Sequence, residues 1–260
     1  MAGHSKWANI KRQKARVDAK KGQVFARLSR AITVAARHGS ADPAGNFQLR
    51  SAIDKAKAAG IPNDNIERAI AKGAGQLDAD GDAWEEIRYE GYGIAGVAIL
   101  VEAITDNRNR TAADLRAAFS KHGGNLGETG CVGWMFEQQG ILSVLGSCQE
   151  DRLLEILLEA EADAYELVEL EPEPLLEVKT AAQQLEQTTQ VLTAQGLQVV
   201  DTELRWVSEL AVQIADLNQA KLLLNLMDTL EDLDDVQSVT ANFELTETIM
   251  VELGESFAVG

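Results

Sequence analysis

Cysteine and histidine are scarce in this chain, which has two cysteines and three histidines among 260 residues. Cys131 and Cys148 form no CxxC pair, so we expect free thiols in a reducing compartment. The histidines lie far apart in the sequence and show no zinc-ligand spacing. The sequence therefore predicts no metal site and no cofactor.

Long hydrophobic runs are absent as well. No apolar run approaches the roughly 20 residues that span a membrane, and the first residues lack the apolar core of a secretory signal. We therefore expect a cytoplasmic protein with no membrane partner. The sequence also has no nucleophile elbow, no Walker loop and no metalloprotease histidine pair. Nothing in it indicates an enzyme, a catalytic residue or a small-molecule substrate.

Basic residues are concentrated at one end of the chain. Residues 1–75 carry 15 Lys and Arg against 5 Asp and Glu, a formal charge of +10, whereas residues 76–260 carry a formal charge of −27. The total of −17 at pH 7 therefore hides a basic head on an acidic body. Such a chain binds a polyanion through its head only, because the body repels it.

The most basic segment is residues 1–21, which contain no apolar stripe and are expected to form a flexible arm. Closely spaced cations neutralise phosphates and release counterions, and a tryptophan among them is able to stack on a base or to bury itself in a partner. The alternative is a solvated tail that keeps the protein in solution. Cations continue into the first predicted helix, so the candidate nucleic-acid contacts are Lys6, Trp7, Lys11, Arg12, Lys14, Arg16, Lys20, Lys21, Arg27 and Arg30.

Three helical segments follow the arm, at residues 23–38, 46–59 and 63–72. Apolar residues recur at helical spacing in each segment, and a glycine follows each one as a natural stop. Short amphipathic helices of this kind bury their apolar stripes against one another, which predicts a small helical domain over residues 22–75. The glycine- and aspartate-rich stretch at 73–82 is typical of a linker.

Beyond the linker the apolar period changes from that of a helix to that of a strand. A hairpin is expected over 84–104, followed by a helix at 108–121 and a strand at 131–137. The order from residue 140 to 206 is βαββαβ, which is the ferredoxin-like unit. A strand, a helix and a strand over 209–243 then resume the earlier pattern.

The expected fold class is therefore α+β, with an N-terminal three-helix domain followed by two α/β domains, one ferredoxin-like and inserted into the other. The predicted boundaries are 1–21 for the basic arm, 22–75 for the helical domain, 82–137 with 207–245 for the discontinuous domain, and 138–206 for the insertion.

Two patterns resemble ligand sites but have simpler structural explanations. Gly91–Gly96 matches G-x-G-x-x-G, which binds pyrophosphate only between a strand and a helix; here a strand follows, so a tight hairpin is favoured. The acidic run Glu231–Asp235 lacks the glycine and the spacing of an EF-hand loop and is interpreted as a solvated turn.

Arg108 and Arg110 lie in the first turn of a predicted helix, where the helix dipole favours acids. A purely structural role is therefore less natural for this pair. Two interpretations have equal weight: the arginines contact a phosphate or an acidic partner, or they form salt bridges with carboxylates of the acidic body.

Several segments also resemble a known family, and they are spread over almost the whole chain: Ala2–Trp7 with Asn9–Lys11, Tyr89–Gly93, Asp106–Thr111, Gly123–Gly127 and Leu230–Gln237. They are similar to the YebC/PmpR family, whose relatives include the mitochondrial translational activator of cytochrome oxidase. The resemblance implies a three-domain cytoplasmic protein. Bacterial members are described as DNA-binding transcriptional regulators, whereas other relatives act in translation at the ribosome.

We interpret the chain as a non-enzymatic, nucleic-acid-binding regulator of gene expression. The resemblance implies a DNA-binding transcriptional regulator. The alternative is a ribosome-associated translation factor that binds rRNA through the basic arm, because an arm that orders on binding is able to enter an irregular RNA cavity. A third class, a protein-interaction adaptor, leaves the arm unexplained.

Overall fold

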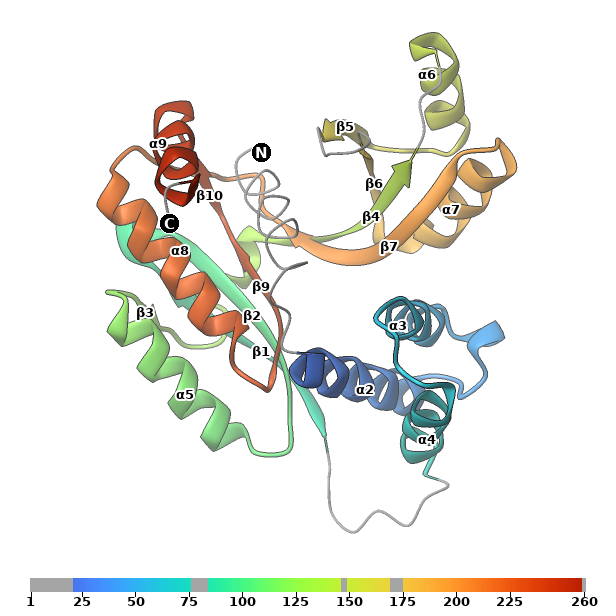
Figure 1. Ribbon diagram of the computed structural model, residues 1–260, viewed down its shortest axis with the longest axis horizontal. Coiled ribbons are helices and arrows are strands. Elements are labelled where there is room, and N and C mark those ends of the chain that lie inside the picture. The colour runs from blue at the N-terminus through green and yellow to red at the C-terminus, as the bar shows by residue number, and fades with distance from the viewer. Residues whose placement is uncertain (1–20, 76–83, 146–148, 169–174, 259–260) are drawn as a thin grey trace. The chain divides into compact units, whose positions relative to one another are not determined.

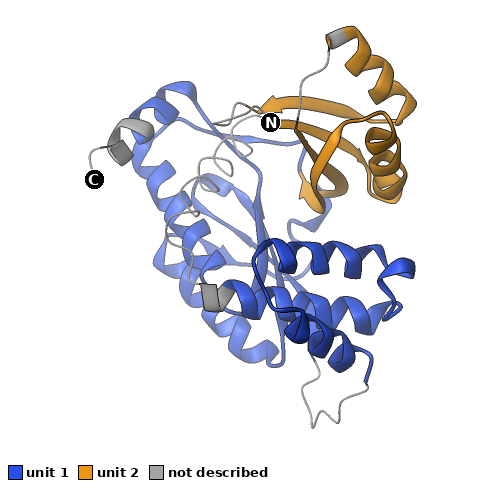
Figure 2. Ribbon diagram, turned by 45° about the vertical axis from the view of Figure 1, so that its right-hand side comes forward, with its two compact units in different colours: residues 1–135, 208–260 blue, residues 136–207 orange. Residues whose placement is uncertain are grey.

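The computed structural model describes residues 21–75, 84–145, 149–168 and 175–258. The chain divides into two compact units, of which one comprises residues 1–135 and 208–260 and the other residues 136–207 (Figure 2). None of the described helices is long and apolar enough to cross a membrane.

The first unit begins with three helices, α2 (Lys21–His38), α3 (Phe47–Ala58) and α4 (Asn63–Gly73) (Figure 1). They enclose one hydrophobic cluster, to which α2 contributes Ile32 and α3 contributes Leu49. The Asn46 side chain caps α3 by accepting a hydrogen bond from the Leu49 backbone N–H at 3.0 Å. The expected three-helix domain is thus present, with helix ends within two residues of the predicted ones.

Gly73 does not end a helix in the way the sequence suggested. It is the last residue of α4 and is buried. A Cβ atom at this position would lie 2.3 Å from the Thr33 carbonyl oxygen in α2, so glycine is required here by the close approach of two helices. The residue in the left-handed conformation is Gly75, with φ of 71°.

A four-stranded sheet forms the centre of the same unit (Figure 1). Its strand order is β3-β1-β2-β9, and every neighbouring pair is antiparallel. The strands are β1 (Glu85–Tyr92), β2 (Ala98–Thr105), β3 (Asn125–Leu126) and β9 (Val236–Ala241). The predicted hairpin over 84–104 is therefore correct, and the G-x-G-x-x-G segment forms the end of β1 and its turn into β2.

Two helices share a core with this sheet, α5 (Arg108–Lys121) and α8 (Leu217–Glu231). Phe119 of α5 and Leu223 of α8 are fully buried together with Ile99 of β2. A parallel pair of short strands, β8 (Val212–Ile214) and β10 (Phe243–Leu245), and the helix α9 (Glu247–Ala258) complete the unit. The strand expected up to residue 243 is interrupted at Asn242, whose side chain accepts a hydrogen bond from the Ala98 N–H at 2.7 Å.

The second unit has the element order β4 (Glu137–Leu145), α6 (Glu150–Glu159), β5 (Ala164–Val168), β6 (Leu175–Ala181), α7 (Leu185–Ala194) and β7 (Gln198–Val207). Its sheet order is β5-β6-β4-β7 with all neighbours antiparallel, which is the ferredoxin-like arrangement. The unit is inserted into the first one, and its first and last strands pair at Glu137 and Val207.

Candidate nucleic-acid interface

Most of the predicted nucleic-acid contacts fall in the arm. Seven of them lie outside the described residues: Lys6, Trp7, Lys11, Arg12, Lys14, Arg16 and Lys20. Lys21 begins α2, but its side chain is also outside the described part. Of the ten candidates, the structure therefore describes the side chains of Arg27 and Arg30 only.

Arg27 and Arg30 contact the turn between α8 and β9. The Arg27 guanidinium donates from Nη2 to the Glu231 carbonyl oxygen at 2.6 Å, and the Arg30 guanidinium donates from Nη1 to the Asp234 carbonyl oxygen. Arg30 Nη1 also lies 3.6 Å from Asp235 Oδ1. Both arginines thus join the helical domain to the acidic body within the first unit.

Trp84 provides a second contact between the same two regions. The Arg30 guanidinium lies over the Trp84 ring, 4.9 Å from its centroid, and the Lys72 ammonium lies 5.9 Å from it. The Arg37 guanidinium donates to the Trp84 carbonyl oxygen at 3.2 Å. Cations of α2 and α4 therefore gather around an aromatic ring at the start of β1.

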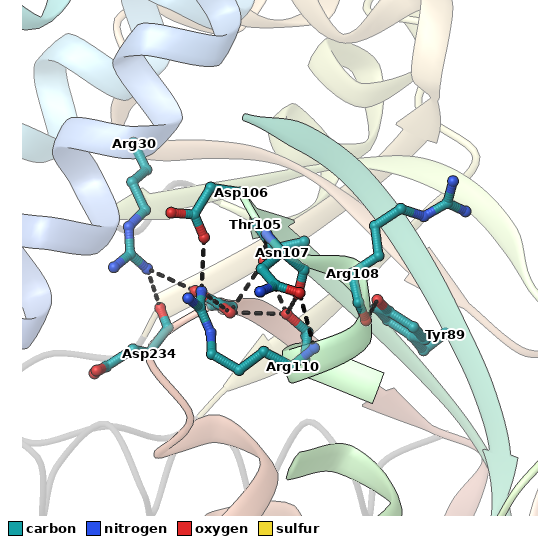
Figure 3. A network of polar contacts seen from close by, with 10 residues as sticks. Arg30, Tyr89, Thr105, Asp106, Asn107, Arg108, Arg110 and Asp234 are labelled. Atoms are coloured by element: carbon teal, nitrogen blue, oxygen red, sulfur yellow. Dashed lines mark hydrogen bonds and ion pairs between the residues drawn. The ribbon is translucent and has the colours of Figure 1, made fainter. Parts of the chain in front are cut away.

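Asp235 joins this turn to the start of α5 through hydrogen bonds. Figure 3 shows the surrounding polar network, with Arg30 and Asp234 on one side and Arg110 and Asp106 beside them. Asp235 Oδ2 accepts hydrogen bonds from Arg110 and Thr111 at 2.8 Å each and from Thr105 at 3.1 Å. Burial raises the pKa of Asp235, but these hydrogen bonds and the Arg110 charge outweigh burial and hold the pKa below its usual value. The interpretation of the acidic run as a solvated turn is wrong for Asp235, which is 6% exposed.

The two arginines of the α5 first turn differ in their surroundings. Arg110 Nη2 lies 2.8 Å from Asp106 Oδ1 and 2.8 Å from Asp235 Oδ2, so it forms the ion pairs with the acidic body that were one of the two interpretations. Arg108 has an exposed side chain, and its Nη1 lies 3.9 Å from Glu85 Oε2. Asn107 caps the helix by accepting from the Arg110 N–H at 3.1 Å.

A cavity of about 570 Å³ opens beside this network, between α2, the first turns of α5 and the turn that precedes β9. Aspartates dominate its lining over arginines, which makes it unfavourable for a phosphate. The described residues contain no group of three His, Cys, Asp or Glu side chains able to hold a metal ion. The lining residues are Arg30, Trp84, Asp106, Arg110, Thr111, Asp114, Asp232, Leu233, Asp234 and Asp235.

Sequence reasoning missed the role of Glu90. Its buried carboxylate accepts three backbone hydrogen bonds, from Gly130 at 2.8 Å and from Val132 and Gly133 at 2.7 Å each. These bonds hold residues 131–136 in a loop with a 3₁₀ turn at Gly133–Met135, so the strand predicted at 131–137 is wrong and β4 begins at Glu137. The available signal in the sequence was an acidic residue, Glu90, next to the glycines at the end of a predicted strand.

The fold and the charge distribution define a class: α+β proteins in which a basic helical domain precedes an acidic body that contains a ferredoxin-like insertion. Two family descriptions match the chain. "TACO1/YebC protein N-terminal domain" covers residues 5–76, and "TACO1/YebC second and third domain" covers residues 84–243. The chain belongs to the TACO1/YebC family.

Curated relatives and a solved structure agree with this membership. A "probable transcriptional regulatory protein" of Acaryochloris marina is 72% identical over 97% of this chain and 100% of the relative. A protein of the same name from Cyanothece sp. is 68% identical over 97% of this chain and 99% of the relative. The crystal structure of a conserved hypothetical protein from Aquifex aeolicus is 42% identical, with a TM-score of 0.79, and the match covers 90% of this chain and 94% of that one.

Proposed function

We propose that this protein is a transcriptional regulator that binds duplex DNA through its basic N-terminal 75 residues. The observation that carries the proposal is the division of charge, +10 in residues 1–75 against −27 in the remainder. A duplex is attracted to the head and repelled by the body, so the charge fixes which end of the protein faces the DNA. The names of the relatives from Acaryochloris marina and Cyanothece sp. support the same class of function.

The helical domain favours phosphate contacts over base contacts. Helices α3 and α4 are consecutive and joined by residues 59–62, which is the connection seen in helix-turn-helix motifs. A recognition helix reads bases through its first residues, but α4 exposes Asp64 and Glu67 there. Carboxylates at those positions oppose entry into a groove lined by phosphates. Affinity from cations with little base discrimination is therefore expected.

The exposed carboxylates at the start of α4 also support a second candidate function. A protein that reads shape and backbone instead of base edges is suited to structured RNA, and the lysine-rich arm provides cations that order on binding. In this alternative the protein is a ribosome-associated translation factor that binds rRNA through the arm.

The DNA proposal is tested by the salt dependence of binding. If about six arm cations meet duplex phosphates, log K falls with log salt concentration with a slope of about −5. Changing Lys11, Arg12, Lys14 and Arg16 to Glu removes four of these cations and flattens the slope. A matched variant changes four exposed cations of the acidic body to Glu (Arg116, Lys121, Arg152 and Lys221) and keeps the slope. A flat slope for the natural chain contradicts duplex binding through the arm.

Sedimentation with ribosomes separates the two candidates. A translation factor sediments with ribosomes at low salt, and the four-residue arm variant is lost from that fraction while the matched variant is retained. A DNA-binding regulator shows the steep salt slope on duplex DNA and is absent from the ribosomal fraction.

A further inference from the structure

We propose that the acidic turn, residues 231–235, competes with nucleic acid for the helical domain: it occupies Arg27 and Arg30 in the free protein and is displaced when these arginines bind phosphates. This inference rests on the proposed function, since it concerns regulation of the same basic surface. The acidic turn would then act as an intramolecular competitor that lowers affinity for weak or non-specific nucleic acid.

The contacts place the two arginines where a helix end carries negative charge. Glu231 is the last residue of α8, so its carbonyl oxygen has no donor within the helix. It accepts a hydrogen bond from Arg27 instead, at 2.6 Å. Arg30 donates to the Asp234 carbonyl oxygen in the following turn. The side chains of Asp232 and Asp234 are exposed and add two negative charges beside these carbonyls. The carbonyl oxygens and carboxylates together provide hydrogen-bond acceptors and negative charge, as a phosphate group does.

The acidic turn satisfies the two arginines only in part. Among the described residues, Arg27 Nε is buried and has no hydrogen-bond partner. Burial lowers the pKa of Arg27, and the Glu231 and Asp232 charges, which raise it, offset that effect incompletely. The Arg30–Asp235 ion pair is long, at 3.6 Å. A contact with an unsatisfied donor and a long ion pair is one that a better acceptor is able to replace.

A phosphate is that better acceptor. Arg27 and Arg30 are three residues apart in α2 and therefore lie on the same helix face. Guanidinium groups bind phosphate oxygens bidentately, so one backbone strand is able to satisfy both side chains, including the donor that the turn leaves unpaired. Phosphates and the acidic turn cannot occupy these donors together, which makes the two contacts mutually exclusive.

The test uses the full chain with Glu231→Gln, Asp232→Asn and Asp234→Asn combined. Asp235 is kept because it holds the start of α5. With the competitor weakened, binding to a labelled 30-base-pair DNA duplex and to a single-stranded RNA of equal length should tighten about tenfold at fixed salt. The slope of log K against log salt should stay nearly the same, since the two arginines meet phosphates in both complexes once the turn is displaced.

A control variant separates this mechanism from general repulsion. Glu209→Gln, Glu247→Gln and Glu252→Gln together remove the same three negative charges from exposed positions of the same unit. If the control tightens binding as much as the turn variant, the effect is long-range repulsion and the proposed competition is wrong.

Removal of the two arginines gives an independent test of the competition. Arg27→Gln with Arg30→Gln should weaken binding less than about twofold in the natural chain, where the turn already occupies them, and about tenfold in the turn variant. Equal losses in the two backgrounds contradict the competition. The combination also reports partner identity, because it is measured on both the duplex and the RNA.

Chemical modification tests the contact without nucleic acid. Arg27 should react slowly with phenylglyoxal in the natural chain and severalfold faster in the turn variant, with the exposed Arg68 as internal reference in mass spectrometry. Unchanged reactivity overturns the inference. If Arg27 is released but no variant binds DNA or RNA, the proposed function is wrong and the competition falls with it; if the natural chain binds and the turn variant behaves as the control, the competition alone is wrong.

Discussion

The carboxylate of Glu90 fixes the conformation of a loop that is distant from it in the sequence. It lies in β1, yet its three acceptor contacts are all made to a loop about 40 residues later in the chain. Of the three donors, the Val132 N–H is buried, and leaving a buried N–H unpaired costs about 1–3 kcal/mol, whereas Gly133 is half-buried and Gly130 exposed. The side chain therefore fixes where the loop turns and where β4 begins.

Replacing Glu90 should destabilise the protein, chiefly by leaving the buried Val132 N–H unpaired and to a smaller extent through Gly130 and Gly133. We expect Glu90→Ala to lower the free energy of unfolding by about 3 kcal/mol, since no acceptor remains, and Glu90→Gln to lower it by about half of that, because one carbonyl oxygen persists. Urea denaturation followed by circular dichroism measures both. Glu86→Gln, at an exposed position of the same strand, should stay within about 0.5 kcal/mol of the natural protein. Comparable losses in Glu86→Gln and Glu90→Gln would refute a specific role for Glu90.

The same residue gives a pH dependence with a defined sign. Burial raises the pKa of Glu90, but the three backbone donors and the Arg88 charge outweigh burial, so the folded pKa lies below the usual 4.5. A carboxyl group with a depressed folded pKa contributes stability that is complete above its unfolded pKa and is lost as the pH falls through the folded value. The difference in unfolding free energy between the natural chain and Glu90→Gln should therefore be full at pH 7 and shrink below pH 4.5. A difference that grows on acidification would contradict this assignment.

Helix packing in the helical domain depends on backbone contact between α2 and α4. The Thr33 hydroxyl, which is buried, donates across the interface to the Ala69 carbonyl oxygen at 3.2 Å. At Gly73 the helices are so close that a Cβ atom would lie 2.3 Å from the Thr33 carbonyl oxygen and 2.8 Å from the Ala36 Cβ. Neither contact is with a flexible side-chain end, so the helices themselves would have to move.

We therefore expect Gly73→Ala to destabilise the helical domain. The gain in helix propensity is about 1 kcal/mol, whereas overpacking against backbone costs about 1–3 kcal/mol and shifts α4 away from α2. Overpacking should win, with a net loss of about 1–2 kcal/mol. Gly45→Ala in the same domain is the matched control, because its Cβ would have no neighbour closer than 3.8 Å. Thermal unfolding of the two variants decides the matter, and a Gly73→Ala protein as stable as the Gly45→Ala protein would show that the helices have room.

Elements whose signals are local could be predicted from the sequence. The α5 helix was expected at 108–121 and runs over Arg108–Lys121, because its Asn107 cap and its apolar spacing lie in neighbouring residues. The strand predicted at 131–137 is instead a loop up to residue 136, because the Glu90 carboxylate, from a distant part of the chain, binds its backbone. The two-residue strand β3 is too short to leave any periodic signal.

At the scale of the whole molecule, the distribution of charge along the chain could be predicted, but the ion pairs between distant residues could not. The basic head and the acidic body follow from counting residues, but the sequence does not show that Arg30 and Arg110 meet at one aspartate. Asp235 lies more than 120 residues from Arg110 and Thr111, which bind it, so neighbouring sequence gives no sign that it is buried. The insertion was recognisable because a complete βαββαβ order interrupts a sheet whose remaining strand, β9, comes after it.

That insertion should fold as an independent domain. The second unit has its own buried side chains, among them Leu142 of β4, Val178 of β6 and Leu192 of α7, and its entry and exit strands pair at Glu137 and Val207. A fragment of residues 136–207 should therefore show one cooperative urea transition, with an m-value of about 1 kcal/mol/M for a domain of this size. Leu192→Ala in the fragment should lower its stability by about 2–4 kcal/mol. The chain enters and leaves the insertion at paired residues, so the two ends lie side by side. Replacing the insertion with a short glycine-serine linker should therefore leave the first unit folded. A fragment without a cooperative transition, or a first unit that unfolds when the insertion is removed, would mean that the two units depend on each other for stability.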